Sequence, residues 1–394
     1  MATQDPTLVR AQCSFSCALE VSAWFGGLYE PGANPGRRRL RRVAGLVVLG
    51  RSPKSKAEKD SYETAGIACF RFAPRLRDYP DKVRRLLLMA LLAAVPACKS
   101  PAAGPGDAAG LPIETRAVSI TDASLTGLKL RGTVELFAEH TEFGGFSGLL
   151  IENGRLTAVN DAGWLLKAEL RDGSDGLSLR KASFRQLLDS EGRRLRKRGG
   201  DAEALARVGG QLWIAFERDH RLEHYPDQRP RAEIRNRSFE GLRSNSGLEA
   251  LATLPDGRML AIAEGGDADG FPMFLVARSG AVKRASLPRI GNHAVTGADV
   301  GPDGRLYVVL RSYFPLLGVS IRVHSYRLKP DGLPDAATRK VLAAFESASG
   351  IDNMEGIAVW TDAKGRTRLT LIADNNFNSI QRNLLMDFEV LTER

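Results

Sequence analysis

Short apolar segments separated by turns recur along most of the chain after residue 140. In five repeats, an apolar segment leads through a turn containing Gly to a second apolar segment. Two of the turns, Asp256-Gly257 and Asp303-Gly304, are typical of β-hairpins, because Gly accepts a positive φ. The first apolar segments begin at residues 147, 203, 249, 296 and 355. The pattern therefore predicts a β-hairpin that is repeated five times.

The spacing of the repeats predicts how the hairpins assemble. Their intervals are 56, 46, 47 and 59 residues, which is typical of β-propeller blades rather than of helical solenoids. The weaker apolar segments 273–277 and 323–328 would complete two of the blades. We predict an all-β propeller over residues 113–394, with six blades preferred and five as the alternative. Residues 130–137 and 385–391 would jointly close the ring, and a β-sandwich is the competing fold.

Charge and cysteine are concentrated in the N-terminal part of the chain. Residues 1–97 hold 16 of the 56 Lys and Arg and 8 of the 46 Asp and Glu, and so carry most of the net charge of +10. The remainder is near neutral, which removes the main electrostatic argument for a nucleic-acid partner. The four cysteines are Cys13, Cys17, Cys69 and Cys98. The propeller region therefore has neither a disulfide framework nor a thiolate metal site.

An apolar stretch with the features of an export signal occupies residues 83–97. It begins with Val83-Arg84-Arg85, and the apolar part that follows is too short to span a bilayer as a helix. Its ending, Val95-Pro96-Ala97-Cys98, resembles the lipobox of bacterial lipoproteins. That resemblance implies a lipid anchor at Cys98 and a place in the cell envelope, at the outer membrane facing the periplasm. A buried segment of an N-terminal domain is the alternative.

The predicted export signal determines what we expect of the segments on either side of it. Residues 98–112 are rich in Gly, Ala and Pro and are expected to form a flexible tether. Because export signals begin a chain, we expect residues 1–82 to come from a misplaced start site, or to be disordered. The mature protein is expected to be a monomer.

Polar residues recur at both ends of the apolar segments, and a propeller places equivalent positions around one axis. The residues that open the first segments are Ser147, Glu203, Glu249, Thr296 and Glu355. The residues that end the second segments are Asp161, Glu217, Glu264, Arg311 and Asp374. Burying carboxylates without partners is costly, and Ca²⁺, which prefers oxygen ligands, would relieve their repulsion. The pattern therefore predicts a polar site in the central channel.

Particular roles follow from this pattern. The expected metal ligands are Asp201, Glu203, Glu249, Glu355 and Asp374. The expected catalytic residues are Glu203, Glu249, Glu355 and Arg311. Arg218 and Arg311 are expected to bind an anionic ester substrate. For any one of these acids, capping a turn or pairing with Arg is the alternative. His220 either reaches the channel mouth or is a surface-loop histidine, and no P-loop, dinucleotide fingerprint or Cys/His zinc pattern is present.

Several motifs resemble the bacterial family called "esterase-like activity of phytase". They are Phe143-Gly144-Gly145-Phe146-Ser147-Gly148-Leu149, Asp201-Ala202-Glu203-Ala204-Leu205, Glu249-Ala250-Leu251, Asn353-Met354-Glu355-Gly356-Ile357 and Asp374-Asn375-Asn376-Phe377. The resemblance covers about residues 132–390. It implies an exported propeller that hydrolyses phosphate or other esters with the help of Ca²⁺. The competing functions are a non-catalytic envelope propeller that binds a small ligand or partner, and a lactonase-like propeller.

Overall fold

The computed structural model describes residues 18–29, 40–51 and 106–391, apart from 122, 174–175, 196, 267–269 and 315–317. The chain divides into two compact units, residues 1–99 and 100–394. In the first unit, β1 (Ala18–Tyr29) pairs antiparallel with β2 (Leu40–Arg51). The predicted export signal over 83–97 and the predicted lipidation at Cys98 lie outside the described residues and stay predictions.

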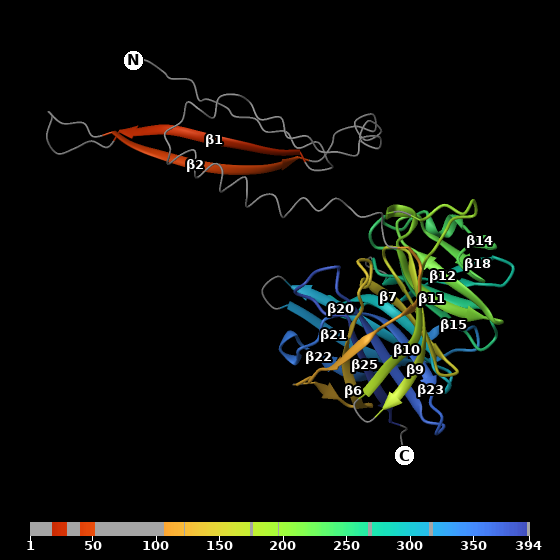
Figure 1. The fold of residues 1–394 in the computed structure, drawn as a ribbon. Coiled ribbons are helices and arrows are strands. Elements are labelled where there is room, and N and C mark those ends of the chain that lie inside the picture. Colours follow the sequence, from red (N-terminus) through yellow and green to blue (C-terminus); the bar gives the residue numbers. More distant parts are fainter. Residues whose placement is uncertain are drawn as a thin grey trace. The chain divides into compact units, whose positions relative to one another are not determined.

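The second unit is all-β, and its described residues form five antiparallel sheets (Figure 1). The first sheet contains β7 (Phe146–Glu152), β8 (Arg155–Asn160), β9 (Trp164–Gly173), β10 (Gly176–Gln186) and β3 (Ala108–Leu111). The second contains β11 (Ala202–Val208), β12 (Gln211–Phe216), β13 (Arg221–His224) and β14 (Ala232–Ile234). The third contains β15 (Leu248–Thr253), β16 (Met259–Ala263), β17 (Phe271–Val276) and β18 (Val282–Leu287).

The last two sheets include strands from both ends of this unit. The fourth contains β19 (Ala294–Val300), β20 (Arg305–Phe314), β21 (Gly318–Leu328), β22 (Pro334–Phe345) and β5 (Ser124–Leu125). The fifth contains β23 (Asn353–Thr361), β24 (Thr367–Asp374), β25 (Leu384–Val390), β6 (Leu128–Phe137) and β4 (Glu114–Ala117). Short 3₁₀ turns are η3 (Lys197–Gly199), η4 (Arg237–Phe239) and η5 (Ser347–Ser349). No helix in the described part of the chain is long and apolar enough to cross a bilayer.

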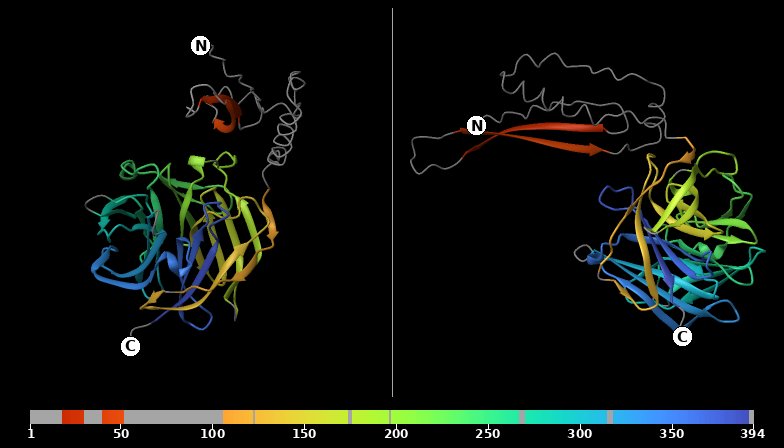
Figure 2. Two further views of the ribbon diagram at one scale, coloured as in Figure 1. Left: turned by 90° about the vertical axis from the view of Figure 1, so that its left-hand side faces the viewer. Right: turned by 60° about the horizontal axis from the view of Figure 1, so that its bottom comes forward.

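The sheets are the blades of a propeller, as the sequence predicted. Their first strands, β7, β11, β15, β19 and β23, contact one another in sequence, and β23 contacts β7 to complete the ring. The blades are therefore arranged around one axis rather than stacked as in a sandwich, and Figure 2 shows them from two further sides. The ring is closed as predicted, because the C-terminal β25 pairs with the N-terminal β6.

The preferred number of six blades is wrong, since the described residues form five. The N-terminal strands make no blade of their own. Instead β3 extends the first blade, β5 the fourth, and β6 with β4 the fifth. Six was too high because residues 108–137 add strands to existing blades, and the alternative of five blades is correct. The pairing of β3 with β10 also places residues 108–111 in the propeller, within the segment that was expected to be only a tether.

The apolar character of the strands reflects burial on both faces of each blade. Five clusters of buried side chains fill the five interfaces between neighbouring blades. Between the second and third blades, for example, Ala204 and Trp213 share a cluster with Leu251 and Met259. A strand covered on both faces has no solvent face to carry polar residues, so it reads as a continuous apolar run rather than as an alternating one. Polar residues are consequently displaced to the strand ends.

Every first strand has a β-bulge at the same place. The pairing with the second strand skips one residue between Phe146 and Gly148 in the first blade, and at the equivalent place in each other blade. A bulge leaves one residue outside the ladder and turns its side chain. The skipped residues are Ser147, Glu203, Glu249, Thr296 and Glu355, which we call the bulge ring. They are the positions predicted to face the channel.

The residue after each bulge is Gly or Ala, because the first strands approach closely there. A Cβ added to Gly356 would lie 2.9 Å from the carbonyl oxygen of Ser147, and one added to Gly148 would lie 3.1 Å from the Cα of Ala204. At Gly297 the nearest atom would be the carbonyl oxygen of Glu355. These contacts are with the backbone, which cannot move aside as a side chain can.

We therefore expect Gly297→Ala to lower the free energy of unfolding by about 1–3 kcal/mol, as overpacking does in a closely packed interior. Chemical denaturation of the purified protein measures the change. Gly241→Ala is the matched control, because an added Cβ there meets nothing within 4 Å. Equal stability of the two variants would show that the blades separate easily at the ring.

Candidate active site

Two rings of side chains meet at one end of the channel. The bulge ring is the first, and all five of its members are buried. The second consists of the residues that end or directly follow the second strands, together with Arg311 inside β20, and we call it the strand-end ring. Its members are Asp161, Glu217, Glu264, Arg311 and Asp374. Asp161, Glu217 and Glu264 each follow the second strand directly, and their backbone N–H groups bond to the residue two before the bulge. The repeat thus places both rings at the same height in every blade.

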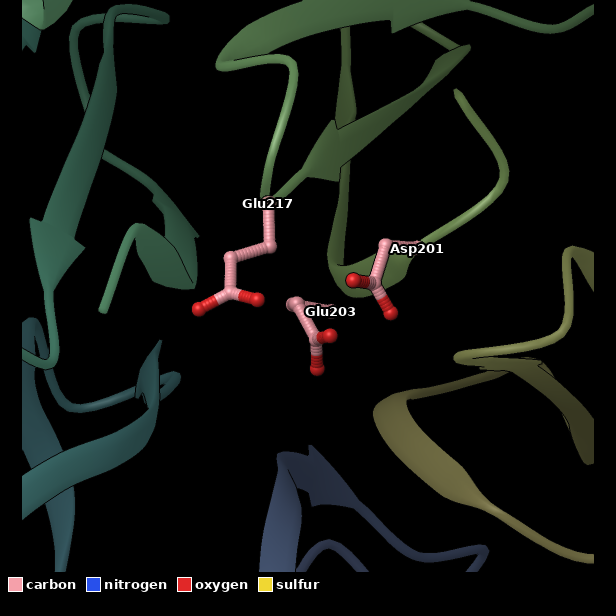
Figure 3. Close-up of side chains that lie close together, drawn as sticks. All are labelled: Asp201, Glu203 and Glu217. Carbon is pink, nitrogen blue, oxygen red and sulfur yellow. The ribbon is translucent and has the colours of Figure 1, made fainter. Parts of the chain in front are cut away.

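Three carboxylates of the second blade form the tightest group. Asp201, Glu203 and Glu217 are all buried, and each offers an oxygen within 4.8 Å of the others. Figure 3 shows that their carboxylates lie together, with Glu203 between the other two. The carboxyl groups of Asp201 and Glu203 lie close enough to interact, and Glu217 accepts a bond of 3.2 Å from the N–H of Gly247. We call these three residues the Asp201 cluster.

Arg311 joins two other blades at the site. Its guanidinium donates to Glu264 at 3.0 Å and to Glu355 at 2.9 Å. It also bonds to the amide oxygen of Asn353. Asn353 in turn donates to Glu355 at 2.8 Å and to Asp374 at 3.1 Å. Arg311 is therefore an internal counter-ion for the acids on its side of the channel.

Arg218 has the corresponding role beside the Asp201 cluster. It pairs with Asp201, and its Nε lies 3.8 Å from Glu217. Unlike Arg311, its side chain is 47% exposed, so it reaches solvent at the channel mouth. Its φ of 20° lies at the edge of the left-handed region, which residues other than Gly seldom adopt. Arg218 is thus the more accessible of the two cations that were predicted to bind an anion.

The acids outnumber the cations around the channel. Eight carboxyl groups lie in the two rings and at Asp201, namely Asp161, Asp201, Glu203, Glu217, Glu249, Glu264, Glu355 and Asp374. In the described part of the chain, their ion pairs are made by Arg218 and Arg311. So large an excess of buried negative charge cannot persist without protons or a bound cation.

Burial raises the pKa of several of these carboxyl groups. For Asp161 the pKa rises to about 7, with a further contribution from the charges of Asp374 and Asp201. For Glu355 burial and the charge of Asp374 raise the pKa to about 8, although Arg311 acts in the opposite direction. Burial also raises the pKa of Glu203 and Glu249 well above the usual value, and neighbouring carboxylates add to the effect.

The structure brings together the residues that the sequence singled out. Glu203, Glu249 and Glu355 come from three different blades, yet the charge of each of the other two raises the pKa of Glu249. Asp201 lies beside Glu203, and Asp374 lies beside Asn353 and Glu355. Their proximity is established, whereas metal binding and catalysis by these residues stay predictions.

Asn353 and His220 are the residues whose places the sequence did not settle. Asn353 stands two residues before Glu355, as Asp201 stands two residues before Glu203, and this shared spacing was the available signal. His220 is not simply a surface-loop residue. A Cβ on Gly247 would lie 2.6 Å from its Nδ1 and 2.8 Å from the Cγ of Glu217, so the ring packs beside the Asp201 cluster.

The donor set suits a hard divalent cation. All three members of the Asp201 cluster offer oxygen, which Ca²⁺ prefers. In the neighbouring first blade, Asp161 has a buried Oδ1 with no hydrogen-bond partner in the described structure. Buried polar atoms are nearly always paired, so an unpaired one indicates a missing ligand or proton. The residues therefore fit Ca²⁺, the metal that the sequence predicted.

Comparison with known proteins identifies a family. A family model described as "Phytase-like: Esterase-like activity of phytase" matches residues 141–377, which include both rings. No curated protein matches the chain significantly.

The solved structures that resemble this chain include proteins of different functions. A gluconolactonase from Xanthomonas campestris is 13% identical, covers 75% of this chain and 100% of its own, and has a TM-score of 0.38. The PQQ-bound aldose sugar dehydrogenase from Streptomyces coelicolor is 13% identical over 72% and 100% of the two chains, with a TM-score of 0.34. The propeller domain of Cps50 (Swd1) from Myceliophteria thermophila is 10% identical over 72% and 100%, with a TM-score of 0.35. At these values the likenesses carry no argument about this chain's chemistry.

The raised pKa values predict how stability depends on pH. A carboxyl group whose pKa is higher in the folded protein binds more protons when folded, so its contribution is present at low pH and is lost as pH rises. In the presence of a chelator we expect Tm to fall between about pH 4, where unfolded carboxyl groups titrate, and pH 8, near the pKa of Glu355.

Thermal unfolding of Glu249→Gln isolates this effect. Removing one buried, repelled charge should raise Tm at pH 8 to 9 and flatten its fall with pH. Glu139→Gln, which removes an exposed charge outside the rings, should leave the profile unchanged. If both variants follow the wild-type profile, the acids of the channel are not destabilised by burial.

Proposed function

The chain belongs to the family described as "esterase-like activity of phytase", and from that premise we propose that its channel site is a Ca²⁺-dependent hydrolase of phosphate esters or related esters. The observation that supports it is the Asp201 cluster, whose three carboxylates lie within 4.8 Å of one another and beside Arg218. A channel mouth that only bound an anion would be expected to be basic, whereas this one has an excess of carboxylates.

Asp201, Glu203 and Glu217 would hold the metal, and the carboxyl group of Glu249 lies close enough to Glu217 to interact with it. When bound, Ca²⁺ supplies polarisation of the ester and a lower pKa for a coordinated water. The negative charges of the three carboxylates are unfavourable where they lie, because burial raises the pKa of each group. A bound cation would neutralise these charges, and this favours metal binding.

The remaining groups act on the substrate and the proton. Arg218, which reaches solvent, orients the anionic end of the ester. Hydrolysis adds the oxygen of water to phosphorus, breaks the P–O bond to the alcohol and returns a proton to the leaving oxygen. Asp161, whose pKa is about 7, exchanges protons readily at neutral pH, and its unpaired Oδ1 is available to do so. Arg311, already bonded to Glu264 and Glu355, positions the acids instead of binding substrate.

The purified protein is expected to hydrolyse esters only when Ca²⁺ is present. Phosphomonoesters, phytate and lactones, each with and without a chelator, test the substrate class directly. We expect turnover of a phosphomonoester that the chelator abolishes and Ca²⁺ restores. Turnover of lactones alone would favour the lactonase-like alternative. Absence of metal-dependent turnover with all three would leave the non-catalytic binding module.

Glu203→Gln keeps the shape of the side chain and removes one charge of the Asp201 cluster. We expect it to weaken Ca²⁺ binding by about 100-fold, since even groups that only support metal ligands contribute 10- to 100-fold. Calorimetric titration with Ca²⁺ measures the affinity, and Glu139→Gln should bind as the wild type does. Wild-type affinity in Glu203→Gln would contradict the assigned ligand.

Calcium binding should also release protons. Because burial raises the pKa of the ligands, the apoprotein holds protons that the metal displaces. We therefore expect the affinity for Ca²⁺ to increase between pH 6 and pH 8. Titrations in buffers of different ionisation enthalpy measure the number of protons released, and zero release at pH 6 would contradict the raised pKa values.

We further propose that the protein acts in the bacterial cell envelope as a lipoprotein anchored at Cys98. Support comes from the sequence of residues 83–98, with its basic start, apolar stretch and Ala97-Cys98 ending. Intact mass and N-terminal sequencing of the native protein test it, since a mature chain that begins upstream of Val83 would contradict the proposal.

A further inference from the structure

A strained turn follows the last residue of β24 at the channel mouth. We call residues 374–378 the rim turn. Asn376 and Phe377 have φ values of 49° and 48°, which place two consecutive residues in the left-handed region. A bulky side chain seldom adopts this conformation, and it persists only where surrounding contacts enforce it. Strain of this kind clusters at sites that bind or react, so the contacts that maintain it are informative.

Side-chain hydrogen bonds hold the rim turn in place. The Oδ1 of Asn375 accepts from the N–H of Gly145 at 2.9 Å and from the N–H of Phe377 at 3.2 Å. The Oδ1 of Asp374 accepts from the N–H of Asn376 at 2.5 Å. The bond to Gly145 crosses from the fifth blade to the first, because Gly145 immediately precedes β7. The turn is thus fixed between two blades and is not a free surface loop.

These contacts place the ring of Phe377 next to Asp161. A Cβ on Gly145 would lie 2.6 Å from Cε2 of Phe377 and 2.5 Å from Oδ1 of Asp161, so both groups rest against the same glycine. That oxygen is the one without a hydrogen-bond partner. Yet Phe377 remains 43% exposed. An aromatic surface is therefore held open to solvent beside the reactive acids.

Further apolar side chains are exposed at the same end of the channel. Ile380, six residues after Asp374, is 86% exposed, and Tyr313, two residues after Arg311, is 65% exposed. Among the described residues five large apolar or aromatic side chains are exposed, and three of them, Tyr313, Phe377 and Ile380, follow members of the strand-end ring. The mouth therefore combines charged groups in the channel with apolar groups around it.

We propose that Phe377 contacts the substrate, and that the substrate is an ester that joins an anionic group to an aromatic or alkyl group. The anionic end would enter towards Arg218, while the apolar end would lie on the ring of Phe377. A densely phosphorylated polyol has no apolar surface for this ring and would gain nothing from it. This inference rests on the proposed function and names its substrate class.

Comparison of two substrates in Phe377→Ala tests the inference. For phenyl phosphate we expect KM to rise about tenfold, the loss expected when an apolar contact of this size is removed. For glycerol phosphate, which lacks an apolar group, KM should be unchanged, and kcat should change little for either. Leu391→Ala is the matched control, because Leu391 is also exposed and lies at the end of β25 remote from the rim turn. An equal change of KM for both substrates would overturn the inference.

Binding measurements separate this inference from the proposed hydrolysis. If the wild type turns over no ester, phenylphosphonate and methylphosphonate can be titrated into it in the presence of Ca²⁺. Tighter binding of the phenyl compound that disappears in Phe377→Ala would sustain the aromatic contact in a binding protein. Equal affinity of the two compounds for the wild type, or no binding of either, would refute it.

Phe377→Gly distinguishes a substrate contact from a structural role. Gly adopts positive φ without strain, so this variant should retain or raise Tm while it loses the preference for the phenyl compound. A marked fall in Tm, with the preference kept, would show that the ring serves only to pack the turn.

Discussion

The close approach of the five first strands around one axis is the constraint on which the other features depend. Gly or Ala must follow each bulge, because the backbone of the next blade occupies the space of a larger side chain. The bulge turns the preceding residue out of the ladder and into the channel. Packing thus dictates the small residue, while the residue before it is free to be Ser, Thr or Glu. Close packing of the first strands has therefore produced five equivalent positions at which functional side chains can lie.

Acids at those positions lower the stability of the folded protein, and other interactions in the propeller must compensate for this loss. Carboxylates from different blades lie close enough to raise one another's pKa, and burial raises it further. Arg218 and Arg311 neutralise only part of this charge, and Asn353 bridges two acids that would otherwise repel. Apolar layers between all neighbouring blades provide the compensating stabilisation. The site is therefore destabilised locally within a frame that is stable elsewhere.

The rim turn extends the same principle to the channel mouth. Its left-handed residues are maintained by Asn375, which bonds across the closure between the fifth and first blades. Because β6 and β25 close that ring from opposite ends of the propeller, the turn is fixed only once the chain has returned to its start. Closure of the propeller consequently determines where two features of the channel mouth lie. These are the unpaired oxygen of Asp161 and the exposed aromatic side chain of Phe377.

The sequence by itself determined the repeated hairpin, the propeller class and the positions that face the axis. These follow from local order, since 14 or 15 residues separate the two polar ends of the hairpin in four of the five repeats and 19 in the last. The number of blades was decided only by the tertiary structure, because β3, β5, β6 and β4 add to blades whose other strands lie far along the chain. For the same reason the sequence could not place Asn353, His220 or Phe377. Each acts through a neighbour on another segment, and such contacts depend on how the closed ring brings distant strands together rather than on spacing along the chain.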